Sequence, residues 1–131
     1  MQITTYKNLI VWQKAVSLAI SVYRLTQQFP AEEKFGLAAQ LNRAAVSIPS
    51  NIAEGRLRGS NNEFRRFLLI AYGSAGEVET QLHIAKHVLP LSTSAYRSAE
   101  TILEEVLKML NTLIRKHSPS SSSSSLLTPH P

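Results

Sequence analysis

The sequence contains no cysteine and no aspartate, so all nine of its acidic residues are glutamates. The absence of cysteine excludes disulfides, thiol nucleophiles and cysteine-ligated zinc or iron–sulfur centres. The absence of aspartate excludes aspartyl dyads, aspartate-held magnesium and most EF-hand loops. A chain without cysteine fits a reducing compartment, and we expect a cytoplasmic protein.

Long apolar runs are also missing. No stretch approaches the ~20 apolar residues of a membrane span, and Met1–Asn8 lacks the basic-then-apolar layout of a signal peptide. The chain has 131 residues, of which 44% are hydrophobic and 18% charged, which is typical of one soluble globular domain. Glycine is scarce and no β-hairpin signature is present. We therefore expect a soluble protein without a membrane partner.

The last fifteen residues differ in composition from the rest. Residues 117–131 contain seven serines and three prolines but no lysine, arginine or glutamate. Such a segment buries too little apolar surface to offset the entropy of ordering it. The composition predicts a folded domain over residues 1–116 and a disordered tail over 117–131.

Apolar residues recur at helical spacing in the folded part. The first such segment covers residues 9–29, with Asn8 as its predicted N-cap and Pro30 just beyond its end. The second segment covers residues 37–55. Because Pro49 lies inside it, we expect a kink in this helix.

The third segment begins with a capping box, in which Ser60 is followed three residues later by Glu63. One face of this helix is apolar for about six turns, up to Pro90. That face comprises Phe64, Phe67, Leu68, Ala71, Ala75, Val78, Leu82 and Ala85. A fourth segment runs from about residue 92 or 94 to 116. Four amphipathic helices with short connections predict an all-α, antiparallel up-down four-helix bundle.

Helix bundles can hold di-iron centres, which require inward-facing glutamates and histidines. The candidate set here is Glu79, His83 and His87 in the third helix, but these residues lie well off its apolar stripe. Glu100 and Glu104 in the fourth helix likewise lie outside its apolar face. The spacing therefore favours a solvated polar edge, and a metal-dependent enzyme built on these residues is the weaker hypothesis.

Other catalytic signatures are missing. The sequence has no nucleophile elbow and no Walker or Rossmann phosphate loop. The small residues of Gly73–Gly76 fall within a helical pattern, where we expect them to let a neighbouring helix approach closely. We predict a protein that is not an enzyme and that holds no metal or cofactor.

A polar stripe follows one face of the second helix. Its members are Gln40, Arg43, Ser47, Asn51 and Glu54. A polar stripe between apolar sectors is often a buried hydrogen-bond network, which here would fix the helix register or a seam between subunits. Arg43 has three candidate partners: Glu54, Glu77 or a carboxylate of another subunit. Direct ligand binding is the alternative role for this stripe.

Positive charge is concentrated between residues 43 and 66, which include five arginines and two glutamates. Four of these arginines are candidates for phosphate binding: Arg56 and Arg58 on the predicted Gly55–Gly59 turn, and Arg65 and Arg66 at the start of the third helix. Arginines beside a helix N-terminus can hold phosphates together with the free backbone amides. The alternative is a solvated end of the bundle. Without an interleaved aromatic platform, the pattern favours contact with the nucleic-acid backbone.

Several segments together resemble a known family. They are residues 11–15, 29–37, 63–68, 73–74 and 77–82, and residues 40–55 with the block RAAVSIPSNIAEG. These segments resemble the bacterial four-helix bundle protein family, which includes the 23S rRNA-intervening sequence proteins. The accessory variability proteins of diversity-generating retroelements are more distant members. The resemblance covers roughly residues 5–115.

This resemblance implies a homopentameric ring around an axial channel with a basic surface. It also implies association with RNA or a reverse transcriptase, and no established enzymatic activity. We therefore expect a non-catalytic homo-oligomer that binds structured RNA through Arg56, Arg58, Arg65 and Arg66. The alternative is a scaffold that docks a nucleic-acid-processing protein and binds no nucleic acid itself.

Overall fold

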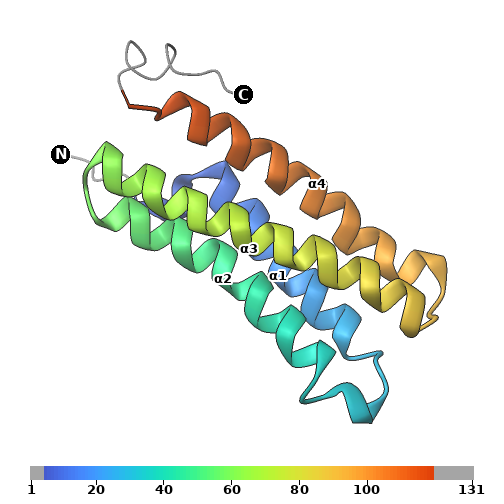
Figure 1. Ribbon diagram of the computed structural model, residues 1–131. Coiled ribbons are helices and arrows are strands. Elements are labelled where there is room, and N and C mark those ends of the chain that lie inside the picture. Colours follow the sequence, from blue (N-terminus) through green and yellow to red (C-terminus); the bar gives the residue numbers. More distant parts are fainter. Residues whose placement is uncertain (1–4, 120–131) are drawn as a thin grey trace, which may run out of the picture.

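The computed structural model describes residues 5–119, which contain four α-helices, two short 3-10 helices and no strand. The elements are η1 Tyr6–Asn8, α1 Ile10–Thr26, η2 Ala31–Glu33, α2 Leu37–Leu57, α3 Asn61–Val88 and α4 Thr93–Lys116. Successive α-helices run antiparallel, with α2 and α3 side by side (Figure 1). The predicted all-α four-helix bundle is confirmed. Most of the predicted tail, residues 120–131, lies outside the described residues.

The start of the first helix differs from the prediction. Asn8 is not its N-cap, because Asn8 is the last residue of η1 and α1 begins at Ile10. The hydroxyl of Thr5 accepts a hydrogen bond from the Lys7 amide at 2.7 Å and so caps η1. A threonine three residues upstream therefore nucleates a separate turn ahead of the helix.

The connection between α2 and α3 is shorter than the predicted Gly55–Gly59 turn. The helix α2 continues through Arg56 to Leu57, and Arg58 is its C-cap. Gly59 has φ +86°, a left-handed conformation that glycine adopts without strain, and it turns the chain into α3. The Ser60 hydroxyl accepts a hydrogen bond from the Glu63 amide at 3.1 Å, as the capping box predicts.

The apolar stripes predicted for the helices form the core. Each helix contributes a fully buried leucine: Leu18, Leu41, Leu68 and Leu110. Pro49 is buried inside α2, and the helix continues through it. Gly55 sets the approach of α2 to α3, because an added Cβ there would lie only 2.6 Å from Phe67 Cβ.

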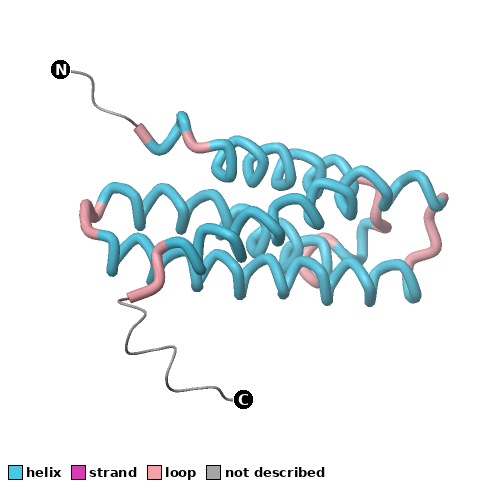
Figure 2. Tube along the Cα trace, turned by 90° about the horizontal axis from the view of Figure 1, so that it is seen from above, coloured by secondary structure: helices cyan, strands magenta, loops and turns pink. Residues whose placement is uncertain are grey.

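The antiparallel order determines which helix ends meet. The start of α1, the end of α2, the start of α3 and the end of α4 lie at one end of the bundle, and the η2 connection lies at the other (Figures 1 and 2). Across residues 5–119, none of the helices is long and apolar enough to cross a membrane.

Candidate nucleic-acid interface

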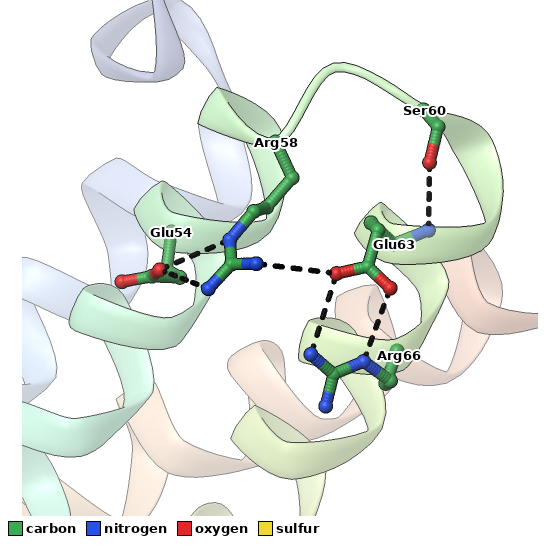
Figure 3. Close-up of polar contacts among 5 residues, drawn as sticks. All are labelled: Glu54, Arg58, Ser60, Glu63 and Arg66. Atoms are coloured by element: carbon green, nitrogen blue, oxygen red, sulfur yellow. Dashed lines mark hydrogen bonds and ion pairs between the residues drawn. The ribbon is translucent and has the colours of Figure 1, made fainter.

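The connection between α2 and α3 holds a chain of ion pairs (Figure 3). Arg58 donates from Nε and Nη2 to Glu54 Oε2, at 3.1 and 2.9 Å. Its Nη1 lies 3.6 Å from Glu63 Oε1. Glu63 in turn accepts two hydrogen bonds from Arg66, at 3.2 and 3.3 Å. Two of the four candidate arginines are therefore neutralised by two glutamates of the same chain.

These pairs also affect ionisation. The hydrogen bond from Arg66, together with the positive charges of Arg66 and Arg58, lowers the pKa of Glu63 below its usual value. The same contact raises the pKa of Arg66. Arg66 is exposed and Glu63 is partly exposed, so their ion pair contributes little to stability and is weakened by salt.

Phe67 lies beneath these arginines. The guanidinium carbon of Arg66 is 4.5 Å from the centre of the Phe67 ring, and that of Arg58 is 5.1 Å away. Arginine stacks favourably over an aromatic face. The ring therefore holds both guanidinium groups against the bundle and limits how far they reach into solvent.

The other two arginines have no carboxylate partner within residues 5–119. Arg65 Nε donates to the backbone carbonyl oxygen of Ile114 at 3.1 Å, which fixes its charge at the end of α4. Arg56 lies over the Phe64 ring at 5.7 Å. The His117 and Phe64 rings also pack edge-to-face, with their centres 5.1 Å apart. Burial, Lys116 and Arg56, in that order, lower the pKa of His117.

The fold adds basic residues that the sequence argument missed. Because α4 ends beside the start of α3, Arg115 and Lys116 join the candidate arginines at the same end of the bundle. Lys7 in η1 lies there too, since η1 packs against α2. The antiparallel order predicted for the four helices already places the end of the fourth helix beside the start of the third, so these residues could have been predicted from the sequence.

Charge is strongly polarised along the bundle. We call residues 5–17, 48–74 and 105–119 the basic half. It contains nine of the fourteen Lys and Arg residues but three of the nine glutamates, a surplus of six positive charges. The remaining half has five basic residues and six glutamates. The ion pair between Lys14 and Glu105, 2.9 Å apart, lies within the basic half.

The polar residues of the α2 stripe make separate sets of contacts. The hydroxyls of Ser47 and Ser74 are 2.8 Å apart, and Asn51 donates to the carbonyl and the hydroxyl oxygens of Ser47. Gln81 donates to Gln40 at 3.5 Å. Glu54 points to Arg58 instead of Arg43. These contacts join α2 to α3 through Ser47 and leave Arg43 exposed and without an ion pair within residues 5–119.

The candidate metal ligands lie along a groove between α3 and α4. Glu79, His83, Glu100 and Glu104 line this groove, which has a volume of about 360 Å³. His87 is placed separately, with Nδ1 2.9 Å from the His83 carbonyl oxygen. In the part of the chain that the structure describes, His, Cys, Asp and Glu nowhere form a group of three arranged to hold a metal ion.

These features define a class: an all-α four-helix bundle in which one half carries most of the positive charge. Residues 7–112 match the family described as 23S rRNA-intervening sequence protein, and the chain belongs to this family. The resemblance inferred from the sequence is thus confirmed. A search of curated proteins gave no match.

A solved structure supports the same assignment. The chain is similar to a protein of unknown function from the S23 ribosomal protein family of Bacteroides thetaiotaomicron VPI-5482, with 27% sequence identity and a TM-score of 0.74. The match covers 81% of this chain and 96% of that protein. The four-helix fold is therefore shared over nearly the whole of the related structure.

Proposed function

We propose that this protein is a non-catalytic, self-associating bundle, by resemblance a pentamer, that binds the phosphate backbone of structured RNA through its basic half. The observation that carries the proposal is the charge polarisation: a surplus of six positive charges lies in the basic half, against a surplus of one negative charge elsewhere. Phosphate contacts of this kind release counterions and are independent of base sequence. Membership of a family described by rRNA intervening sequences supports RNA as the partner.

The contacts within the basic half indicate which of its residues can contribute most to RNA binding. Arg58 and Arg66 already face Glu54 and Glu63, so a phosphate must compete with these carboxylates. Arg56, Arg115 and Lys116 have no ion pair within residues 5–119 and are exposed. We therefore place the main phosphate contacts on these three residues and give Arg58 and Arg66 a smaller role.

The test compares two triple variants in binding to an in-vitro-transcribed stem-loop RNA. Arg56→Gln/Arg115→Gln/Lys116→Gln removes three charges from the basic half. The control, Arg24→Gln/Lys34→Gln/Arg97→Gln, removes the same charge from the other half. The proposal expects about a tenfold or greater loss of affinity in the first variant only. Equal losses in both variants would contradict it.

Self-association would strengthen this binding. Each copy brings its own surplus of positive charge, and linked copies engage one RNA at high effective concentration. Sedimentation velocity of the nuclease-treated protein measures the assembly without relying on RNA.

A second candidate is a scaffold for a protein partner. It is favoured by Phe35, which is 87% exposed in the connection between α1 and α2 and lies beyond the basic half. Aromatic side chains are enriched at protein interfaces, so an exposed Phe35 could anchor a partner protein. Under this alternative, a partner protein stays bound after nuclease treatment and is lost in Phe35→Ser.

A further inference from the structure

The basic half contains an aromatic pair in addition to its arginines. The rings of Tyr6 in η1 and Trp12 in α1 are in contact, with their centres 5.3 Å apart and their planes at 66°. Both residues are partly exposed. An edge-to-face contact occupies the edge of one ring and one face of the other, so it leaves aromatic surface available for a further partner. Stacking on an aromatic side chain is a common way in which proteins hold unpaired bases.

Two side chains hold the short turn that carries Tyr6. The Thr5 hydroxyl accepts a hydrogen bond from the Lys7 amide at 2.7 Å, and Gln13 Nε2 donates to the Lys7 carbonyl oxygen at 2.8 Å. A three-residue 3-10 helix has few hydrogen bonds of its own, so these contacts are what fix the turn to α1. The Tyr6 ring is therefore placed before any ligand arrives, and less ordering is needed on binding.

The residue that follows Tyr6 supplies a positive charge. Lys7 is exposed and forms no ion pair within residues 5–119. The turn that carries both residues also packs against α2, the helix whose last turn contains Arg56. A nucleotide has two matching parts, an aromatic base and an anionic phosphate. Adjacent residues of one turn therefore offer a group for each part.

We infer that the Tyr6 ring stacks on an unpaired base of the bound RNA while Lys7 contacts a neighbouring phosphate. Trp12, which packs against the core, is the positioning residue that holds the Tyr6 ring. Bases of a duplex are already stacked on one another, so this contact favours RNA loops. Every base has an aromatic face, so the preference is for unpaired nucleotides and not for a base sequence. The inference rests on the proposed function and names the part of the RNA that the basic half recognises.

The first test compares two synthetic stem-loop RNAs that have the same stem and the same number of phosphates. One has an ordinary loop, and the other has a loop of abasic residues, which offers nothing to stack. The full-length protein is expected to bind the ordinary loop about fivefold or more tightly than the abasic loop. Trp12 is the only tryptophan of the sequence, so its fluorescence reports on this position and is expected to be quenched more by the ordinary loop. Equal affinity for the two RNAs would overturn the inference.

The second test changes the ring. Tyr6→Leu keeps an apolar side chain but removes the aromatic face, so it is expected to abolish the preference for the ordinary loop and to leave affinity for the abasic loop unchanged. Tyr6→Phe keeps the ring and is expected to retain the preference. Tyr23→Leu is the control, because Tyr23 is an exposed tyrosine of α1 that lies outside the basic half. Circular dichroism checks that all three variants keep the helix content of the wild type.

The outcomes separate this inference from the proposed function. A protein that binds neither RNA overturns both. A protein that binds the two RNAs equally, with affinities unchanged in Tyr6→Leu, retains phosphate binding by the basic half and overturns only the stacking contact. A preference that is lost equally in Tyr6→Leu and Tyr6→Phe assigns the effect to the tyrosine hydroxyl and also overturns stacking.

Discussion

Arg65 Nε lies 3.1 Å from the backbone oxygen of Ile114 and donates a hydrogen bond to it. This contact joins the start of α3 to the end of α4, two segments 49 residues apart in the chain. It satisfies one of the carbonyl oxygens left free in the last turn of α4 and places a positive charge at the negative end of that helix. The same contact brings Arg115 and Lys116 close to the arginines of the α2–α3 connection.

Arg65→Ala is expected to destabilise the fold by about 1–2 kcal/mol, because it removes a charge-assisted hydrogen bond from a half-buried carbonyl. Urea unfolding followed by circular dichroism measures this change. Arg115→Ala is the control, since Arg115 is exposed in the same region and its side chain makes no such contact within residues 5–119. Equal stability of Arg65→Ala and wild type would show that the contact contributes nothing.

Gly55→Ala is expected to cost about 1–3 kcal/mol, because the new methyl group must fit 2.6 Å from Phe67 Cβ and forces α2 and α3 apart. The urea midpoint is the measurement. If the variant is as stable as wild type, or more stable, the two helices can separate there without cost and the close approach is not required.

The pH dependence of stability should contain a contribution from His117. Its pKa is lowered in the fold, mainly by burial, so the unfolded chain binds the proton more readily. The stability of the fold is therefore unaffected well above the ordinary histidine pKa of about 6.5 and falls as pH drops from there toward the lowered value. Urea unfolding between pH 5 and 8 measures this fall, which His117→Gln should reduce. An unchanged profile in the variant would exclude His117 as its source.

Glu63→Gln should strengthen RNA binding. The carboxylate neutralises Arg66 and contributes to pairing Arg58, so its removal frees positive charge in the basic half. The plot of log affinity against log salt is expected to become steeper by roughly 1, the amount for one or two additional phosphates. Glu79→Gln, outside the basic half, removes the same charge and serves as the control. A larger effect of Glu79→Gln would contradict this role for Glu63.

The helices could be predicted because burial repeats with the helical period along the chain. The eight apolar residues predicted for α3 are all buried. The spacing of Glu54 to Arg58 and of Glu63 to Arg66 also indicates ion pairs within a helix or its cap. Asn8 is not the cap of α1 because it ends the separate turn η1, which Thr5 caps, and α1 begins after Leu9 without a side-chain cap.

The candidate site was less predictable because it depends on contacts between helices. The role of Gly55 in close packing required the position of Phe67 on α3. Gly73 and Gly76 were expected to admit a neighbouring helix, but within residues 5–119 no atom lies within 4 Å of a Cβ added at either position. The contact of Arg65 with Ile114 depends on where α4 ends relative to α3 and is not readable from either segment alone.

The most direct test of the central claim is the salt dependence of binding between the nuclease-treated protein and a stem-loop RNA. The account predicts measurable affinity at low salt and a log–log slope steeper than about −2, which corresponds to roughly three or more phosphates per complex. The slope should flatten in Arg56→Gln/Arg115→Gln/Lys116→Gln. Absence of binding at low salt, or a slope near zero, would contradict RNA-backbone binding by the basic half.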